Sequence, residues 1–160
     1  MFEELSQHIL DIAMNSLTAN AKNVRISVRE SRRQDRLVLT VRDDGCGMDR
    51  ATLDKVLAQR WSSKTKRRRP IGLGLAFLRQ AAEMCDGRFQ VRSAPGRGTC
   101  VTASMRLSHI DRPPLGDLNA TILALCAAET KMAVRLNYRS DGEKFHFDSQ
   151  ELATKGAVHL

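Results

Sequence analysis

Aromatic side chains are scarce in this sequence, at 4% of its 160 residues. Proteins that hold single-stranded nucleic acids commonly stack the bases on aromatic residues, and the sequence shows no such motif, no helix-turn-helix and no zinc motif. Long apolar runs are also missing, since none approaches the roughly 20 residues of a membrane-spanning helix. Residues 1–5 lack the basic start of a signal peptide. These absences predict a cytoplasmic protein without a membrane partner.

Cysteine and histidine are equally sparse, with four of each. The cysteines have neither paired nor metal-ligand spacing, so we expect reduced thiols. The histidines are His8, His109, His146 and His159. None of them stands in a metal-binding spacing or in the context of a phosphoacceptor. The sequence therefore predicts neither a disulfide framework nor a histidine metal centre.

Acidic residues are outnumbered, with 18 Asp and Glu against 26 Lys and Arg, which gives a net charge of +8. Residues 1–107 hold 20 basic and 11 acidic residues, whereas residues 108–160 hold 6 and 7. Binding of a polyphosphate explains part of this surplus, and direct binding of nucleic acid is the alternative. A chain of this length buries roughly 68–70% of its unfolded surface. We expect one domain over residues 1–107 with an appendage, residues 108–160, packed on it.

The most informative motif is DDGCGM at residues 43–48, which follows an apolar strand containing Leu37, Leu39 and Val41. A carboxylate at the end of a strand, followed by two glycines, lets a ligand approach the backbone closely. Taken alone, an Asp-Gly pair usually marks an ordinary turn. Three further motifs in the chain favour a nucleotide pocket.

The first of these is an amphipathic helix upstream, in which polar residues recur at spacings of three and four between apolar ones. Asp11 and Asn15 stand four residues apart, so their side chains are neighbours, with Cβ atoms roughly 5–6 Å apart. A carboxylate beside an amide suits the orientation of a water and the binding of a metal ion. A solvated polar stripe is the alternative interpretation of the same spacing.

The second motif is IGLGLAF at residues 71–77, which opens a helix with Leu75, Leu78 and Ala82 on one face and Gly87 as its stop. The free N–H groups and the dipole at the start of a helix attract phosphate. The chain has no Walker A sequence, and no third glycine completes a dinucleotide fingerprint. The third motif, GRGT at residues 96–99, joins two strands and reads alone as a hairpin turn.

In this order the motifs resemble the ATPase superfamily of DNA gyrase, heat-shock chaperones, sensor histidine kinases and mismatch-repair proteins. Residues 11–19 are similar to its N box, residues 43–47 to G1, residues 72–75 to G2 and residues 96–99 to its closing Gly-x-Gly-Thr. The resemblance covers about residues 1–107 and implies an α/β two-layer sandwich, the Bergerat fold. In that fold helices cover one face of a mixed, mostly antiparallel sheet, and ATP lies between the layers.

The resemblance also implies a role for each matching residue. It assigns Asn15 to Mg²⁺ and Asp43 to the adenine amino group. It places Gly45 and Gly47 close to the base, and Thr99 beside Asp43 and its water. The implied cofactors are therefore ATP and Mg²⁺. These roles suit the residue types, because Mg²⁺ prefers oxygen ligands and a carboxylate accepts a hydrogen bond from an exocyclic amine.

The phosphates are expected at the G2 motif and under a basic lid. Residues 60–69 hold six cations, and a mobile basic loop that closes over the triphosphate suits phosphoryl transfer. Lys64 and Lys66 are both candidates for the γ-phosphate, and the sequence does not choose between them. A solvated charged loop is the plainer interpretation. The expected nucleotide contacts of G2 are Gly72, Leu73, Gly74 and Leu75.

Asp11 decides the predicted mechanism. The hydrolysing members and the anti-sigma serine kinases carry a glutamate there as general base, whereas sensor histidine kinases commonly carry an asparagine. A carboxylate takes a proton from water or a serine hydroxyl, and an asparagine does not. Residues 72–107 look most similar to a sensor kinase, yet only a few residues precede the N box, so no phosphoacceptor hairpin is expected there.

The appendage begins at two prolines, Pro113 and Pro114, and is predicted to form a helix followed by a hairpin around residues 141–142. It extends the sheet, docks a partner or forms an edge for a homodimer.

The sequence as a whole predicts a Mg-ATP-binding protein that phosphorylates or regulates a partner protein. An ATP-sensing subunit with little turnover and an ATPase associated with nucleic acid are the alternatives.

Overall fold

The computed structural model describes residues 4–58, 73–128 and 131–151 of the chain. These residues form four helices and six strands, and the chain runs through one helix, two strands, two helices, two strands, one helix and two strands. The helices are α1 (Leu5–Thr18), α2 (Arg50–Ala58), α3 (Leu73–Met84) and α4 (Leu118–Ala127). The strands are β1 (Asn23–Ser31), β2 (Arg36–Asp43), β3 (Phe89–Ala94), β4 (Gly98–Arg106), β5 (Ala133–Arg139) and β6 (Lys144–Asp148).

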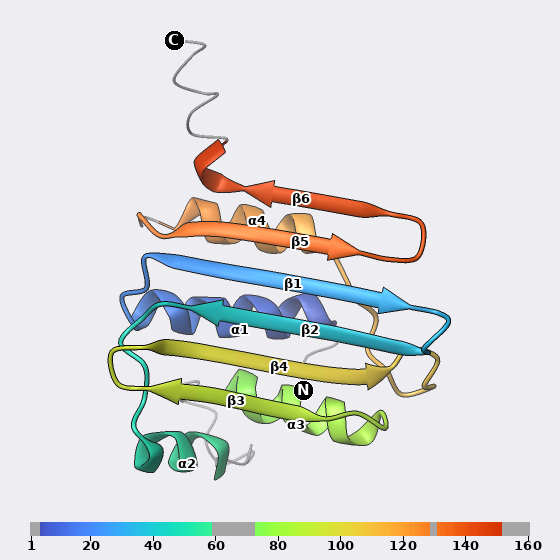
Figure 1. The fold of residues 1–160 in the computed structure, drawn as a ribbon, viewed down its shortest axis with the longest axis horizontal. Coiled ribbons are helices and arrows are strands. Elements are labelled where there is room, and N and C mark those ends of the chain that lie inside the picture. The colour runs from blue at the N-terminus through green and yellow to red at the C-terminus, as the bar shows by residue number, and fades with distance from the viewer. Residues whose placement is uncertain (1–3, 59–72, 129–130, 152–160) are drawn as a thin grey trace.

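The six strands form one mixed sheet in the order β3-β4-β2-β1-β5-β6 (Figure 1). Every neighbouring pair is antiparallel except β1 and β5, which run parallel. Apolar and polar residues alternate along the central strands, so that each strand buries one face, as in the exposed-buried alternation at the start of β1. The predicted mixed, mostly antiparallel sheet is confirmed.

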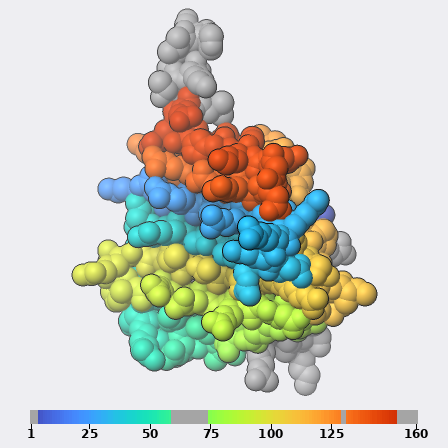
Figure 2. Space-filling view, turned by 45° about the vertical axis from the view of Figure 1, so that its right-hand side comes forward, coloured from blue at the N-terminus to red at the C-terminus, as the bar shows by residue number. Residues whose placement is uncertain are grey.

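Helices α1, α3 and α4 all lie on one face of the sheet, behind the strands in Figure 1. The buried core fills the space between them, and its largest fully buried side chains include Leu5, Ile26, Leu39, Met105 and Leu136. No helix of the described residues covers the opposite face, where the strands themselves form the surface (Figures 1 and 2). The α/β two-layer architecture expected from the motifs is therefore confirmed.

Helix α1 carries the N-box motif. Its buried face is formed by residues at helical spacing, including Leu5, Ile9, Ile12 and Ser16. The regular polar spacing seen in the sequence continues to Lys22, but the helix ends at Thr18. The chain turns there because Asn20 adopts a left-handed conformation, with φ of 58°.

The turn after α1 is held by a residue for which the sequence suggested no task. The Asp44 side chain accepts hydrogen bonds from the backbone N–H groups of Lys22 and Asn23 at 2.8 and 2.9 Å. The Asn23 side-chain amide donates to the same carboxylate at 2.8 Å. These hydrogen bonds hold the pKa of Asp44 below its usual value, with the Asn23 side chain as the largest cause. Asp44 is exposed, as expected, but it fixes the start of β1.

Helix α3 ends close to the predicted stop at Gly87. The left-handed residue is Asp86, with φ of 57°, and the Gly87 N–H donates to the Ala82 carbonyl at 2.8 Å. Gly87 is required for another reason, because a Cβ there would lie 1.7 Å from the Ser104 carbonyl oxygen on β4. The glycine thus lets the end of α3 approach the sheet.

Beyond β4 the chain returns to helix α1. Residues Pro114 and Leu115 accept hydrogen bonds from the first N–H groups of α1, those of Leu5 and Ser6, at 2.9 and 2.8 Å. These carbonyls satisfy donors that a helix start leaves without an intrahelical partner. Helix α4 and strand β5 then follow, and β5 pairs with β1. Of the three possibilities raised for the appendage, the structure shows extension of the sheet. The division of the chain at residue 107 stays a prediction.

In the described part of the chain, no helix combines the length and apolar character needed to span a membrane.

Candidate nucleotide site

A cavity of about 200 Å³ lies between the helices and the sheet, at the end of β2 where Asp43 stands. Its lining is mainly apolar with a few polar groups, which is the usual character of a small-molecule site. The apolar walls include Ile12, Val41, Met48, Val56, Leu75 and Val101. The polar lining residues include Asn15, Asp43 and Thr99.

The Asp43 carboxylate is fixed by three donors. The Ser16 hydroxyl donates to Oδ2 at 2.6 Å, and the Gly45 N–H donates to Oδ1 at 2.9 Å. The Thr99 N–H also reaches Oδ1, at 3.3 Å. A carboxylate offers about four acceptor positions. Among the described residues, three positions of Asp43 are therefore occupied, and one acceptor position is left for a ligand that donates a hydrogen bond.

Two glycines bring the loop after β2 into contact with the hairpin between β3 and β4. A Cβ at Gly47 would lie 2.0 Å from the Ala94 carbonyl oxygen, and a Cβ at Gly98 would lie 2.1 Å from the Asp43 carbonyl oxygen. The Gly96 N–H also donates to the Cys46 carbonyl at 2.8 Å. Two motifs separated by about fifty residues in the sequence therefore form one rim of the cavity.

Gly45 makes a similar close approach to helix α1. A Cβ at Gly45 would lie 2.8 Å from the Ala19 Cβ, and the neighbouring Cys46 N–H donates to the Ala19 carbonyl at 2.9 Å. The loop is thus anchored to the C-terminal end of α1. This contact sets Asp43 beside the helix that carries Asn15.

Asn15 and Asp11 occupy different surroundings although they stand on the same helix. Asn15 lines the cavity. Asp11 lies against the first turn of α3 and is not among the cavity's lining residues: a Cβ at Gly74 would lie 2.1 Å from the Asp11 Oδ2. The predicted base is therefore beside the G2 motif, where the resemblance implies the phosphates, and outside the lining of the cavity.

His8 packs at the same junction between α1 and α3. Its side chain is completely buried, and burial lowers its pKa to about 4, partly offset by a hydrogen bond with the Gly74 backbone. His8 is therefore neutral at pH 7. Sequence reasoning gave it no specific role, and the structure assigns it to the packing of α1 on the start of α3.

Two serines complete the site and were not singled out from the sequence. Ser16 holds Asp43, as described above. The Ser93 hydroxyl accepts a hydrogen bond from the Met48 N–H at 2.8 Å and lies 2.8 Å from the Thr99 hydroxyl. The sequence feature that could have identified Ser16 is its place on the apolar face of the predicted helix, because a buried hydroxyl needs a hydrogen-bond partner. Thr99 contacts Asp43 through its backbone, while its side chain contacts Ser93.

Some of the residues expected to contact the phosphates lie outside the described residues. They are Lys64, Lys66 and Gly72, and the whole basic lid, residues 60–69, lies outside as well. The described residues resume at Leu73, the first residue of α3, whose side chain is not described. Leu75 follows on that helix and lines the cavity.

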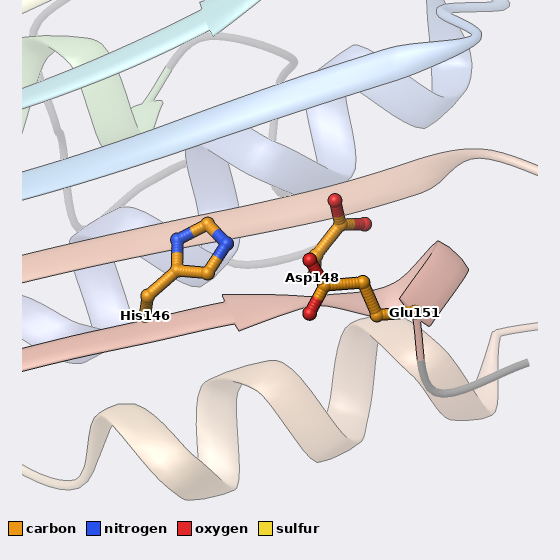
Figure 3. Close-up of side chains that lie close together, drawn as sticks. All are labelled: His146, Asp148 and Glu151. Carbon is orange, nitrogen blue, oxygen red and sulfur yellow. The ribbon is translucent and has the colours of Figure 1, made fainter. Parts of the chain in front are cut away.

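A second cluster of polar side chains lies at the end of β6. His146, Asp148 and Glu151 each offer a ligand atom within 4.8 Å of the others, a grouping that the sequence did not suggest (Figure 3). Asp148 is ion-paired with Arg135 at 3.2 Å, and His146 Nδ1 lies 2.7 Å from the Asn137 Oδ1. Two of the three groups therefore already have protein partners, and we assign no metal to this cluster.

Residues 1–109 match the family model described as "Histidine kinase-, DNA gyrase B-, and HSP90-like ATPase". The chain therefore belongs to this ATPase family, in agreement with the resemblance of its four motifs.

Among curated relatives, the Non-motile and phage-resistance protein of Caulobacter vibrioides is 30% identical over 118 residues, which cover 69% of this chain and 14% of the relative. Sensor protein kinase FleS of Pseudomonas aeruginosa is 38% identical over 99 residues, which cover 62% of this chain and 24% of the relative. The chain thus spans less than a quarter of either relative.

Solved structures of similar fold include the MutL ATPase domain of Aquifex aeolicus in complex with ADP. It has a TM-score of 0.57 and 13% identity, and the match covers 92% of this chain and 64% of that one. The N-terminal domain of a DNA repair protein gives a TM-score of 0.59 at 11% identity, with coverages of 92% and 52%. At these identities the likeness concerns the fold alone.

Proposed function

We propose that this chain binds Mg-ATP in the cavity beside Asp43 and uses it to phosphorylate or regulate a partner protein. The observation that carries the proposal is the fixed Asp43 carboxylate, which has one acceptor position to spare at the end of an apolar cavity. An adenine amino group supplies the matching donor, and the apolar walls suit the faces of the base. Guanine presents a carbonyl oxygen at the same place, which the carboxylate repels.

Asn15 is the residue we assign to Mg²⁺. Asn15 lines the cavity and its side chain carries an amide oxygen, and Mg²⁺ is usually held by one or two protein oxygens together with phosphates and water. When bound, the ion neutralises charge on the phosphate oxygens. Asn15 contributes one neutral ligand to the ion. Helix α1 also carries Ser16, which holds Asp43, so the helix sets the position of the ion relative to Asp43.

The phosphate end of the site is assigned to the start of α3. Helix N-termini favour anions, and Gly74 brings the backbone of α3 against α1. Asp11 lies at this junction, so a substrate hydroxyl or water near the γ-phosphate has a carboxylate base within the same region. Four free cysteines support a reducing compartment such as the cytoplasm for this activity.

Nucleotide selectivity tests the adenine assignment. Binding of ATP and GTP is measured by isothermal titration calorimetry with Mg²⁺ for the wild type, Asp43→Asn and Asp44→Asn. We expect Asp43→Asn to weaken ATP binding at least about tenfold, because an amide N–H₂ group replaces an acceptor. Asp44→Asn is the matched control, since Asp44 is adjacent but binds only the turn after α1. Equal ATP affinity in wild type and Asp43→Asn would contradict the proposal.

Turnover tests the role of Asp11. Phosphate release and transfer to candidate proteins are followed for the wild type, Asp11→Asn and Asn15→Ala. If Asp11 is the base, Asp11→Asn keeps ATP affinity and loses turnover about 10²- to 10⁴-fold. Asn15→Ala is expected to lose the dependence of binding on Mg²⁺. Wild-type turnover in Asp11→Asn would exclude Asp11 as the base.

An ATP sensor with little turnover is the second candidate, and one observation favours it. The Asp11 carboxylate is packed against Gly74 and lies outside the cavity lining. If binding is tight, turnover is absent and Asp11→Asn still regulates the partner, the sensing function is the correct one.

A further inference from the structure

The sheet face opposite the helices is lined by arginines. Along β1 the buried residues Val24, Ile26 and Val28 face the helices, so Arg25 and Arg29 point to the other side. A similar alternation of more buried and more exposed residues holds along most of β2, β3, β4 and β5. No helix of the described residues lies over this side (Figures 1 and 2), which we call the open face.

Strand register aligns these arginines in two rows across the sheet. In the first row, Arg92 stands opposite Cys100 and Cys100 opposite Arg42. Arg42 in turn pairs with Arg25, and Arg25 with Arg135. Arg135 pairs with Asp148 on β6, so the row crosses all six strands and places three arginines, Arg42, Arg25 and Arg135, on adjacent ones.

The second row lies four residues further along the strands. Arg29 pairs with Arg139, and Arg139 with Lys144 on β6. Between the two rows runs a line of uncharged polar residues, which includes Thr40, Ser27 and Asn137. At about 3.3 Å per residue, the two basic rows are roughly 13 Å apart.

This arrangement is costly for the isolated protein. Like charges directly opposite on neighbouring strands destabilise a sheet, and here Arg25 has an arginine on each side. Among the described residues, the only carboxylate in the first row is Asp148, which pairs with Arg135 at 3.2 Å. In the part of the chain that the structure describes, the side chains of Arg25, Arg29, Arg42, Arg92 and Arg139 make no hydrogen bond or ion pair.

The first row ends in a hollow of about 350 Å³. Residues 42–43, 92–94 and 97–100 line it, and they include the three arginines Arg42, Arg92 and Arg97. Asp43 also belongs to this lining, but its carboxylate is held by Ser16 on helix α1 and by the Gly45 N–H. Three guanidinium groups around one concavity suit an anion with several oxygen atoms, such as a phosphate group, because guanidinium binds such oxygens in pairs.

We propose that the open face binds the sugar-phosphate backbone of a double-stranded nucleic acid. Contacts to that backbone come from Arg and Lys together with Ser, Thr, Asn and Gln. These residue types make up most of the two rows and the line between them, and the exceptions are Val38, Cys100, His146 and Asp148. The separation of the rows is close to the roughly 12 Å width of the major groove, so the rows match phosphates on its two sides.

Two other partners fit this face less well. A protein interface needs apolar or aromatic anchors at its centre, and the line between the rows is uncharged and polar. A single strand needs aromatic residues for stacking, and the described residues of the two rows include none. The proposal does not rest on ATP binding, because the cavity beside Asp43 lies between the sheet and the helices.

The test is fluorescence anisotropy of a labelled DNA duplex of about 20 base pairs, with the full chain, between about 20 and 200 mM NaCl. The first variant, Arg25→Gln/Arg42→Gln, removes two neighbouring cations of one row. The second, Arg29→Gln/Arg139→Gln, removes two of the other. Lys55→Gln/Arg79→Gln on helices α2 and α3 is the control with the same net charge.

We expect wild-type affinity to fall steeply with salt, and each open-face variant to bind about tenfold more weakly with a log–log salt slope smaller by about two. The control should retain at least half of the wild-type affinity. Both open-face variants relieve repulsion between like charges, so they should melt no lower than the wild type, which separates lost binding from lost folding.

Four results would overturn the assignment. The first is no duplex binding at the lowest salt. The second is an equal loss in the control and the open-face variants. The third is equal competition by poly-L-glutamate or by single-stranded DNA, which would point to an acidic protein or an unpaired strand. The fourth is displacement by saturating Mg-ATP, which would place the duplex at the nucleotide site. Duplex binding that survives Mg-ATP supports the open face even if Asp43→Asn leaves ATP affinity unchanged.

Discussion

At the scale of single residues, the rim of the cavity depends on close backbone contact. Gly96 and Gly98 have nearly the same φ, 75° and 77°, so replacing either with alanine imposes the same conformational cost of roughly 1–2 kcal/mol. Their surroundings differ. A Cβ at Gly96 meets nothing within 4 Å, whereas a Cβ at Gly98 would lie 2.1 Å from the Asp43 carbonyl oxygen.

We therefore expect Gly98→Ala to lower the free energy of unfolding by roughly 3 kcal/mol or more and to weaken ATP binding. Gly96→Ala should be destabilised only by the conformational cost and should bind ATP as tightly as the wild type. Urea denaturation and calorimetry measure the two effects. Equal destabilisation by the two substitutions would mean that the contact between Gly98 and Asp43 contributes nothing.

His8 predicts a specific dependence of stability on pH. Its pKa is about 4 in the folded protein and about 6.5 in the unfolded chain, because the buried imidazole resists protonation. Between these values the unfolded chain binds a proton that the folded one excludes. The free energy of unfolding should therefore fall as pH drops from about 6.5 to 4, by at most about 3 kcal/mol.

His8→Leu removes this titration while keeping an apolar side chain at the buried position. The wild type should lose more stability than His8→Leu between pH 6.5 and 4, as measured by urea denaturation at each pH. The carboxylates titrate in both proteins and cancel in the difference. Parallel pH profiles would show that His8 is accessible to protons in the folded state.

At the scale of elements, β5 joins the carboxyl-terminal segment to the part of the chain that carries the candidate nucleotide site. β5 pairs with β1 over seven residues, and Leu136 on β5 is only 1% exposed. Helix α4 packs on α1, where the Thr121 hydroxyl donates to the Ser6 carbonyl at 3.2 Å. These contacts predict that both parts unfold together.

Leu136→Ala should lower the free energy of unfolding by about 2–5 kcal/mol through the cavity it leaves. Unfolding followed by circular dichroism and by loss of ATP binding should give the same midpoint in this variant. Phe145→Ala, at a position on β6 that is 47% exposed, is the control and should cost much less. Loss of the carboxyl-terminal strands at lower urea than ATP binding would indicate two independent units.

At the scale of the whole molecule, the net charge of +8 is unevenly distributed. The arginine rows concentrate positive charge on one face, while the helices cover the other. Salt screens repulsion between exposed charges, with a Debye length of about 10 Å at 0.1 M. We expect the wild-type melting temperature to rise between about 10 and 150 mM NaCl.

The same rise should be smaller in Arg25→Gln/Arg42→Gln, because fewer like charges remain to be screened. Differential scanning fluorimetry of both proteins, with Lys55→Gln/Arg79→Gln as the charge-matched control, measures the change. An equal response in all three proteins would place the repulsion elsewhere than on the open face.

The sequence alone determined the family and the layer architecture, and it singled out part of the cavity's lining, namely Asn15, Asp43, Gly47, Leu75 and Thr99. Asn15, Asp43 and Leu75 were identified by motifs whose chemistry depends on local spacing, and local spacing is preserved in the fold. The strands could also be predicted, because the alternation around Leu37, Leu39 and Val41 follows directly from the two-residue repeat of a strand.

Only the tertiary structure decided which distant groups meet. Ser16 holds Asp43, Gly98 touches the Asp43 backbone, and Asp11 lies against Gly74 because helices and loops far apart in sequence pack at one point. The arginine rows arise in the same way, since they depend on strand order and register, which local patterns do not encode. A motif determines which chemical group a residue supplies, and long-range packing determines which other residue that group contacts.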